Sequence, residues 1–209
     1  MMASRFPSKG LYLITPTEMR PERLRRLLGD MLQAGVAAVQ YRRKRFSDEA
    51  EAADLLALCR SHRVPFIVND DPELARRIGA DGVHVGADDA DVATARRTVG
   101  DRGIVGVSCY GELWRAVRAS AEGADYVAFG SFFESRTKPE AKRAEPALLR
   151  RARAELKIPI VAIGGITREN AVVLLDHGAD CLALSAGLFE AAAPARAVAD
   201  LAALFAVEA

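Results

Sequence analysis

The chain has 209 residues, half of them hydrophobic, and a formal net charge of +1 at pH 7. This length allows one large or two small domains, and the composition is that of a globular protein with ample core. The near-zero charge gives no reason to invoke nucleic acid or an anionic membrane as a partner. No segment approaches the roughly 20 apolar residues of a membrane span.

The start of the chain and its cysteines indicate the cellular compartment in which the protein is expected. Residues 1–9 are polar and lack the apolar core of a signal peptide, and we expect them to be a flexible extension of a single domain over 1–209. The three cysteines, Cys59, Cys109 and Cys181, are far apart and form no C-x-x-C motif. Free thiols in a reducing cytoplasm are therefore expected.

Apolar runs alternate with helical patterns along the whole chain. In chain order the pattern predicts strand 10–15, helix 21–34, strand 35–39 running into the polar stretch 40–44, helix 47–62, strand 65–70, helix 72–78, strand 81–85, helix 89–99, strand 104–108, helix 113–121, strand 126–129, a helix from 146, strand 158–163, helix 167–177, strand 181–185 and helix 194–207. A long loop, 130–144, separates the sixth strand from its helix.

Capping residues mark several of these helices. Ser47 is expected to cap one helix, with Asp48 in its first turn, where an acid suits the helix dipole. Asp71 is expected to cap another, with Pro72 as its first residue, and Thr167 to cap a third.

A weak repeat, Gly-Ala-Asp, precedes three of the predicted strands, at 79–81, 123–125 and 178–180. In each, the glycine can end a helix in the left-handed conformation before the chain turns into the sheet. Eight strand–helix units with nearly continuous apolar strands favour a closed (β/α)8 TIM barrel, an α/β fold. No G-x-G-x-x-G follows the first strand, which weakens the alternative of an open dinucleotide-binding sheet.

The polar stretch after the second strand indicates an anion site. Side chains alternate along a strand, so Gln40, Arg42 and Lys44 are expected to share one face. Arg offers a planar fork for phosphate oxygens and Lys a mobile charge. The alternative is a strand end that turns polar on reaching solvent.

Other polar residues follow other strands, where a TIM barrel has its active site. Asn69 and Asp70 follow the third strand, Asp89 lies beyond the fourth, and Ser108 ends the fifth. Asp70 and Asp89 are either ion-pair partners of nearby cations or ligands of Mg²⁺, which takes one or two carboxylates plus substrate phosphates.

The later loops suggest phosphate binding. Gly164-Gly165 before the Thr167 helix, and Ser185 after the last strand, form a candidate phosphate cradle, because glycines let backbone N–H groups approach an anion. The alternative is a pair of turn glycines. Lys138, in the long loop, belongs either to a functional lid or to a solvated charged loop.

The remaining candidates carry less chemistry. His84 is expected to be packed and hydrogen-bonded, and His62 and His177 to lie near helix ends. Trp114, at helical spacing with Val117, is expected in the core. No Ser-His-Asp or Cys-His pairing is convincingly placed, so nothing indicates covalent catalysis.

Taken together, these stretches resemble the thiamine-phosphate synthase family. The matching segments cover nearly all of the chain in family order: 40–44, 69–71, 80–86 with Asp89, 106–108, 123–130, 135–138, 158–166 and 184–185. The resemblance implies a transferase that joins hydroxymethylpyrimidine diphosphate to thiazole phosphate, giving thiamine phosphate and pyrophosphate with Mg²⁺ as cofactor.

The resemblance also implies roles for individual residues. The pyrimidine diphosphate would be bound by Gln40, Tyr41, Arg42, Arg43, Lys44, Asn69, Ser108 and Lys138, of which Arg42, Lys44, Ser108 and Lys138 would be catalytic. The thiazole phosphate would be bound by Ser135, Arg136, Thr137, Gly165, Leu184 and Ser185, and Mg²⁺ by Asp70 and Asp89. The partners would be small molecules, with no nucleic acid or membrane, in the cytoplasm.

Three residues depart from the family pattern: Ala87 where many relatives have Gln, Ser135 for the commoner Thr, and Glu134 where Pro is frequent. Two rival functions share the barrel. A thiazole tautomerase-like enzyme would not need both the diphosphate cations and the paired aspartates. A non-catalytic protein that binds thiazole phosphate would show tight binding without turnover.

Overall fold

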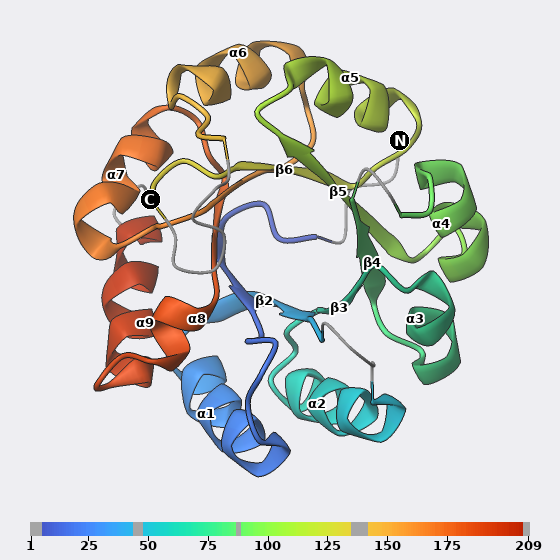
Figure 1. The fold of residues 1–209 in the computed structure, drawn as a ribbon, viewed down its shortest axis with the longest axis vertical. Helices are drawn as coiled ribbons and strands as arrows, with labels where there is room; N and C mark the ends of the chain where they lie inside the picture. Colours follow the sequence, from blue (N-terminus) through green and yellow to red (C-terminus); the bar gives the residue numbers. More distant parts are fainter. Residues whose placement is uncertain (1–5, 44–47, 87–88, 135–141, 207–209) are drawn as a thin grey trace.

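The computed structural model describes residues 6–43, 48–86, 89–134 and 142–206. Eight parallel strands form a closed barrel in chain order (Figure 1). Strand β8 pairs with β1 and so completes the ring. The predicted (β/α)8 TIM barrel is confirmed. The strands are β1 (Gly10–Ile14), β2 (Val36–Tyr41), β3 (Phe66–Asn69), β4 (Gly82–Val85), β5 (Ile104–Tyr110), β6 (Tyr126–Gly130), β7 (Ile160–Ile163) and β8 (Cys181–Leu184).

Helices surround the ring of strands (Figure 1). They are α1 (Pro21–Gln33), α2 (Glu49–Ser61), α3 (Pro72–Ile78), α4 (Val92–Val99), α5 (Leu113–Ala121), α6 (Ala147–Glu155), α7 (Arg168–Asp176), α8 (Ala186–Phe189) and α9 (Pro194–Ala202), and a short 3-10 helix, η1 (Ala203–Phe205), follows α9. The sequence pattern did not predict α8. None of the helices in the described part of the chain is both long and apolar enough to cross a membrane.

Side-chain caps set the first residues of several helices. Asp71 accepts a backbone N–H of α3, and Thr167 forms a capping box at α7, as predicted. Asp48, rather than the predicted Ser47, caps α2; Ser47 itself lies outside the described residues. Asp91 caps α4. The helix expected from 89 therefore starts at Val92, and Asp89 lies in the loop before it.

The Gly-Ala-Asp repeats form one structural device at the amino end of the barrel. Gly79, Gly123 and Gly178 have φ angles of 68°, 95° and 100°, the positive values expected for glycine at a helix end. The aspartate that follows accepts the backbone N–H near the start of the preceding strand, over 2.7–2.9 Å. The pairs are Asp81 with Phe66, Asp125 with Val105 and Asp180 with Ile160.

The core has two parts because side chains alternate along the strands. Outward residues such as Leu11 and Leu13 pack with the helices. Inward residues, including Tyr12, Ile14 and Tyr126, form a separate cluster inside the barrel. Besides these, the inner cluster contains Phe6, Ala38, Ile67, Ile104, Ala128, Val161, Cys181 and Ala183.

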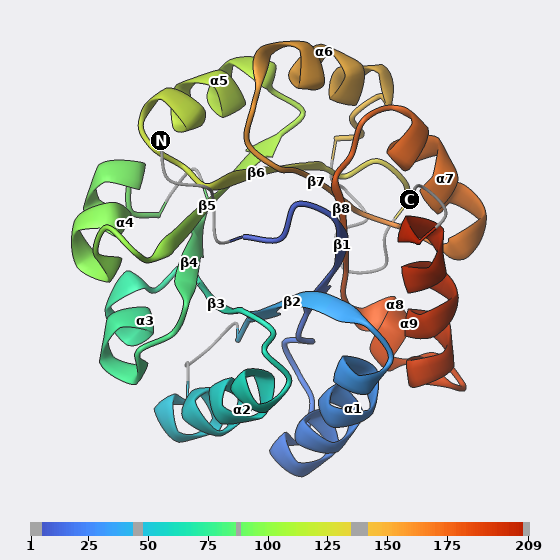
Figure 2. The same ribbon diagram turned by 180° about the vertical axis from the view of Figure 1, so that it is seen from behind.

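The expectation that 1–9 is a flexible extension is wrong for Phe6, which is 3% exposed. Its ring stacks on Tyr126 and meets the edge of Tyr12. The reason is that the barrel interior offers an apolar site, which the one aromatic residue of a mostly polar segment can fill. Figure 2 shows this first described segment, in dark blue, lying inside the ring of strands before it enters β1.

We predict that Asp180→Ala lowers the free energy of unfolding by about 1–3 kcal/mol, because Ile160 N–H loses its acceptor and Arg153, 2.7 Å from the carboxylate, loses its ion pair. Asp200→Ala is the control: its exposed ion pair with Arg196 is expected to be worth about 0.5 kcal/mol or less. Urea unfolding measures both, and equal losses would contradict the role given to the repeat.

Candidate active site

The carboxyl ends of the strands bring most of the described candidate residues to one rim. Because all eight strands are parallel in one ring, residues that end or follow β2, β3, β4, β5, β7 and β8 share this side of the barrel. They are Gln40, Arg42, Asn69, Asp70, Asp89, Ser108, Gly164, Gly165, Leu184 and Ser185. Lys44, Ala87, Ser135, Arg136, Thr137 and Lys138 lie outside the described residues.

Asp70 and Asp89 interact directly at this rim. Burial raises the pKa of the Asp70 carboxyl to about 6, and a hydrogen bond and the negative charge of Asp89 act in the same direction. The Asn69 side-chain amide donates to Asp70, and the positive charge of Arg42 favours the ionised form. Asp70 has a φ angle of +63°, which a non-glycine residue rarely adopts and which Asp tolerates better than most.

Asp89 is held by the backbone. Its Oδ2 accepts the N–H of Gly86 over 2.8 Å, which fixes the carboxylate beside the end of β4. The Asp70 N–H donates to the carbonyl of His84 over 2.8 Å, which ties the other carboxylate to the same strand. The Asp70 backbone and the Asp89 carboxylate are thus both tied to the end of β4.

This pair fits a Mg²⁺ site of a particular kind. Among the residues that the structure describes, no group of three or more His, Cys, Asp or Glu side chains could hold a metal ion. Mg²⁺ commonly takes one or two carboxylates and completes its shell with water and phosphate oxygens. Two adjoining carboxyls whose negative charges oppose each other suit such a cation, provided that a phosphate ligand supplies further oxygens.

Gln40 and Ser108 reach the rim from the barrel interior. The Gln40 Nε2 donates to the Tyr12 hydroxyl over 2.9 Å, and Ser108 Oγ lies 2.8 Å from His84 Nε2. His84 is buried and hydrogen-bonded, as predicted, and burial lowers its pKa to about 4. The imidazole is therefore neutral at pH 7.

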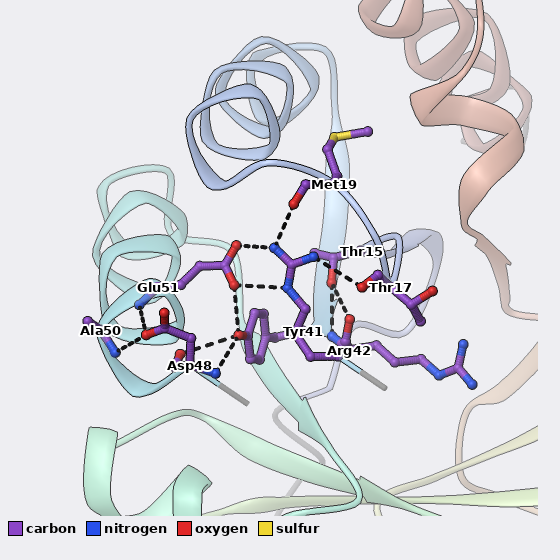
Figure 3. Close-up of polar contacts among 9 residues, drawn as sticks. Thr15, Thr17, Met19, Tyr41, Arg42, Asp48, Ala50 and Glu51 are labelled. Carbon is purple, nitrogen blue, oxygen red and sulfur yellow. Dashed lines mark hydrogen bonds and ion pairs between the residues drawn. The ribbon is translucent and has the colours of Figure 1, made fainter. Parts of the chain in front are cut away.

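Tyr41 lies on the other face of the polar stretch, toward α2 (Figure 3). Arg43 contacts the same helix through Glu51. Arg43 Nε and the Tyr41 hydroxyl each donate to Glu51 Oε2 over 2.9 Å, and the Arg43 and Glu51 side chains are 11% and 8% exposed. Arg43 also donates to the carbonyls of Thr17 and Met19.

That Tyr41 and Arg43 bind substrate stays a prediction, and in the structure both side chains have another role. Their polar groups are already used to join α2 to the end of β2, and Arg43 also joins the loop after β1. The Arg42 side chain extends away from this cluster (Figure 3), while its N–H donates to Thr15 Oγ1 over 2.9 Å. Alternation along the strand thus separates Arg42 from its neighbours on both sides.

The glycines after β7 are needed for close packing. Gly164 and Gly165 have φ angles of +108° and +62°. A Cβ on Gly164 would lie 2.0 Å from Ser131 Oγ, and one on Gly165 would lie 2.2 Å from the Glu134 carbonyl oxygen. The turn therefore packs against the loop that follows β6. This explains the glycines whether or not a phosphate binds there, so both interpretations of the pair remain open.

Glu134 and Ser185 can also be placed. The Glu134 side chain is 81% exposed and lies 3.3 Å from Arg143, so its negative charge is directed to solvent and partly neutralised. Ser185 precedes α8, whose single turn begins directly after it. Leu184, the last residue of β8, is buried at the same end of the barrel.

Trp114, Val117 and the three cysteines lie outside the site. Trp114 is 57% exposed and Val117 37%, so the prediction that they belong to the core is wrong; they line an exposed groove between α5 and α6. The three cysteines are buried free thiols, as predicted.

Sequence reasoning missed two residues behind the site, Tyr12 and Tyr126. Both are tyrosines in otherwise apolar strands, at positions that alternation directs inward. A buried tyrosine hydroxyl needs a hydrogen-bond partner, and this requirement was the available signal.

Comparison with known proteins gives a consistent result. Residues 11–188 match the family model of thiamine monophosphate synthase. A thiamine-phosphate synthase from Thiobacillus denitrificans is 51% identical over 206 residues, covering 97% of this chain and 97% of that protein. One from Methylococcus capsulatus is 50% identical over 203 residues, covering 96% and 91%. The solved thiamine phosphate pyrophosphorylase of Pyrococcus furiosus superposes with a TM-score of 0.80, at 30% identity over 93% of this chain and 94% of that one.

We predict that Glu51→Gln lowers the free energy of unfolding by about 3 kcal/mol, because the buried Arg43 guanidinium loses its counter-charge. The matched control is Glu73→Gln, whose pair with Arg76 is exposed and is expected to contribute about 0.5 kcal/mol or less. Chemical unfolding at pH 7 measures both variants. Similar transition midpoints for the two would show that Arg43 is not held by Glu51 in solution.

Proposed function

The chain belongs to the thiamine monophosphate synthase family, and we propose that it joins hydroxymethylpyrimidine diphosphate to thiazole phosphate at the carboxyl rim of its barrel. The family makes the chain a transferase that acts on small molecules. The observation that carries the site assignment is the contact between Asp70 and Asp89 beside Arg42 at this rim. A paired-carboxylate site next to a cation suits a metal-bound diphosphate.

In this proposal the pyrimidine diphosphate occupies the side of the rim formed by β2, β3 and β5. Arg42, Lys44 and Lys138 carry the positive charges that bind the diphosphate and stabilise it as it departs. Gln40, Asn69 and Ser108 supply polar contacts to the same substrate. The thiazole phosphate is assigned to residues that end or follow β6, β7 and β8: Ser135, Arg136, Thr137, Gly165, Leu184 and Ser185.

Asp70 and Asp89 are the residues that would hold Mg²⁺. When bound, the cation would neutralise part of the negative charge that develops on the departing diphosphate. The Gly86 and Asp70 backbone bonds described above keep the two carboxyls in place before substrate arrives. Their mutual repulsion is then relieved on binding rather than during the reaction.

The proposed reaction needs no general acid or general base. The bond between the pyrimidine methylene carbon and the diphosphate oxygen breaks, and its electron pair leaves with pyrophosphate. The lone pair of the thiazole nitrogen then forms the new carbon–nitrogen bond. Because that nitrogen carries no proton, no side chain has to remove one, and the rim residues act through charge and position.

We place this activity in the cytoplasm. Three buried free thiols are typical of a reducing compartment. A net charge of +1 supports small-molecule substrates rather than nucleic acid as the partners.

The direct test incubates purified protein with both substrates and Mg²⁺ and follows thiamine phosphate by oxidation to fluorescent thiochrome. Product that forms with Mg²⁺ and disappears with a chelator is the expected result. Tight binding of thiazole phosphate without product would favour the non-catalytic alternative, and isomerisation of a thiazole without condensation would favour the tautomerase alternative.

We predict that Asp70→Asn lowers turnover at least about 100-fold, because one of the two charged metal ligands is lost. Asn tolerates the positive φ angle of this position, so the fold should survive. In wild type, Mg²⁺ with inorganic pyrophosphate should raise the melting temperature, and this rise should be absent in the variant.

The control for this experiment is Asp54→Asn, which changes an exposed carboxylate paired with Arg25 on the outside of the barrel. It should keep both turnover and the Mg²⁺-dependent rise in melting temperature. A Mg²⁺-dependent rise of wild-type size in Asp70→Asn would remove Asp70 from the metal site.

A further inference from the structure

Five polar side chains form one continuous chain of hydrogen bonds across the barrel interior. Gln40 Nε2 donates to Tyr12 Oη over 2.9 Å, and Tyr12 Oη lies 2.7 Å from Tyr126 Oη. Tyr126 Oη lies 2.8 Å from His84 Nδ1, and His84 Nε2 lies 2.8 Å from Ser108 Oγ. The residues come from β2, β1, β6, β4 and β5, and the chain has its two ends at the rim.

The middle of this chain is closed off from solvent. Tyr12, Tyr126 and His84 are buried, and the Phe6 ring stacks on Tyr126 with 3.8 Å between ring centroids. Tyr126 also passes so close to Gly106 that a Cβ there would lie 2.0 Å from its ring. Both ring nitrogens of the buried His84 are hydrogen-bonded to hydroxyl groups and not to a carboxylate, and an unpaired charge is costly in a closed interior, so the imidazole is neutral. Burial also keeps both phenols neutral by raising their pKa.

Because these groups are neutral, the hydrogen bonds between them can all run in one direction, from donor to acceptor. A neutral imidazole has one donor nitrogen and one acceptor nitrogen. A phenol hydroxyl is the better donor and an imidazole nitrogen the better acceptor, which favours donation from Tyr126 to His84 Nδ1. Tyr126 then accepts from Tyr12, which in turn accepts from the Gln40 amide. Each bond supports the next in this order, because every hydroxyl donates once and accepts once.

We propose that this chain holds His84 as its Nε2–H tautomer and so presents the Ser108 hydroxyl to the substrate as a hydrogen-bond donor. Ser108 Oγ accepts from His84 Nε2 and keeps its own hydrogen for a partner at the rim. The acceptor would be a ring nitrogen or a phosphate oxygen of the pyrimidine diphosphate. Tyr12, Tyr126 and His84 are then positioning residues, which act through Ser108 and Gln40.

The direction of these hydrogen bonds decides whether Ser108 offers a donor or only acceptors to the substrate. With the opposite order, Ser108 would donate to His84 and offer only lone pairs at the rim, where an acceptor atom of the substrate would be repelled. The step from tautomer to substrate rests on the proposed function, because it requires that Ser108 contact the pyrimidine diphosphate. The tautomer of His84 depends only on the hydrogen bonds inside the barrel.

The first test reads the tautomer in the free protein. In uniformly ¹⁵N-labelled protein, long-range ¹H–¹⁵N spectra distinguish protonated from unprotonated imidazole nitrogens, and His84→Gln assigns the signal among the three histidines. We expect His84 to be protonated at Nε2 and unprotonated at Nδ1. In Tyr126→Phe the single tautomer should be lost. A wild-type spectrum with the proton on Nδ1 would overturn the proposal.

The second test measures the effect on the substrate. Tyr126→Phe keeps the ring that Phe6 stacks on and should raise KM for the pyrimidine diphosphate about tenfold, while KM for the thiazole phosphate changes less than twofold. Ser108→Ala should have a similar effect, and the double variant should be no worse than Ser108→Ala alone.

The double variant separates positioning from general loss of structure. Additive effects of the two changes, or equal rises in both KM values, would show that Tyr126 acts through packing and would overturn the proposal. Ser108→Ala with wild-type kinetics would refute the contact between Ser108 and the substrate, whatever the tautomer. Tyr12→Phe, which breaks the chain one bond earlier, provides a second variant should Tyr126→Phe fold poorly.

Discussion

The pairing of β8 with β1 is the constraint on which the rest of this structure depends. Once the ring is closed, all carboxyl strand ends lie at one rim, all amino ends lie at the other, and alternate side chains must fill a closed interior. The two ends use the same residue type differently. At the amino end, the Asp81, Asp125 and Asp180 carboxylates are bonded to strand N–H groups and serve stability. At the carboxyl end, Asp70 and Asp89 are held against each other and leave charge available for chemistry.

The end of β2 shows how alternation divides work between neighbours. Gln40 enters the interior, while Tyr41 and Arg43 turn to Glu51 of α2, and Arg42 extends away from that cluster. A run of cations in sequence is therefore not one cluster in space. The buried Arg43–Glu51 pair fixes the outer face of the strand end. The backbone that carries the inner-face residues is thereby fixed as well.

Much of the fold could be predicted because its signals are local. Apolar runs, caps such as Asp71 and Thr167, and the glycines of the Gly-Ala-Asp repeats each act within a few residues. What could not be predicted depends on residues that meet only in three dimensions. The partners of Tyr126 come from β1 and β4, and Phe6 is buried because the interior has room for it. Trp114 is exposed because it lies in the open groove between α5 and α6. The same holds for the site: strand order placed its residues at one rim, while the commitment of Arg43 to Glu51 required the structure.

Phe6, the first described residue of the chain, has its partner Tyr126 roughly 120 positions later, so this contact cannot form before β6 has been made. During synthesis on the ribosome, the opening segment therefore emerges long before its place in the interior exists. Five strands must wait with an incomplete inner layer until β6 has been made, and the rim is complete only when β8 reaches β1. Until the ring closes, the apolar faces and unpaired edges of the strands already made have no partner, which makes the incomplete chain prone to aggregation.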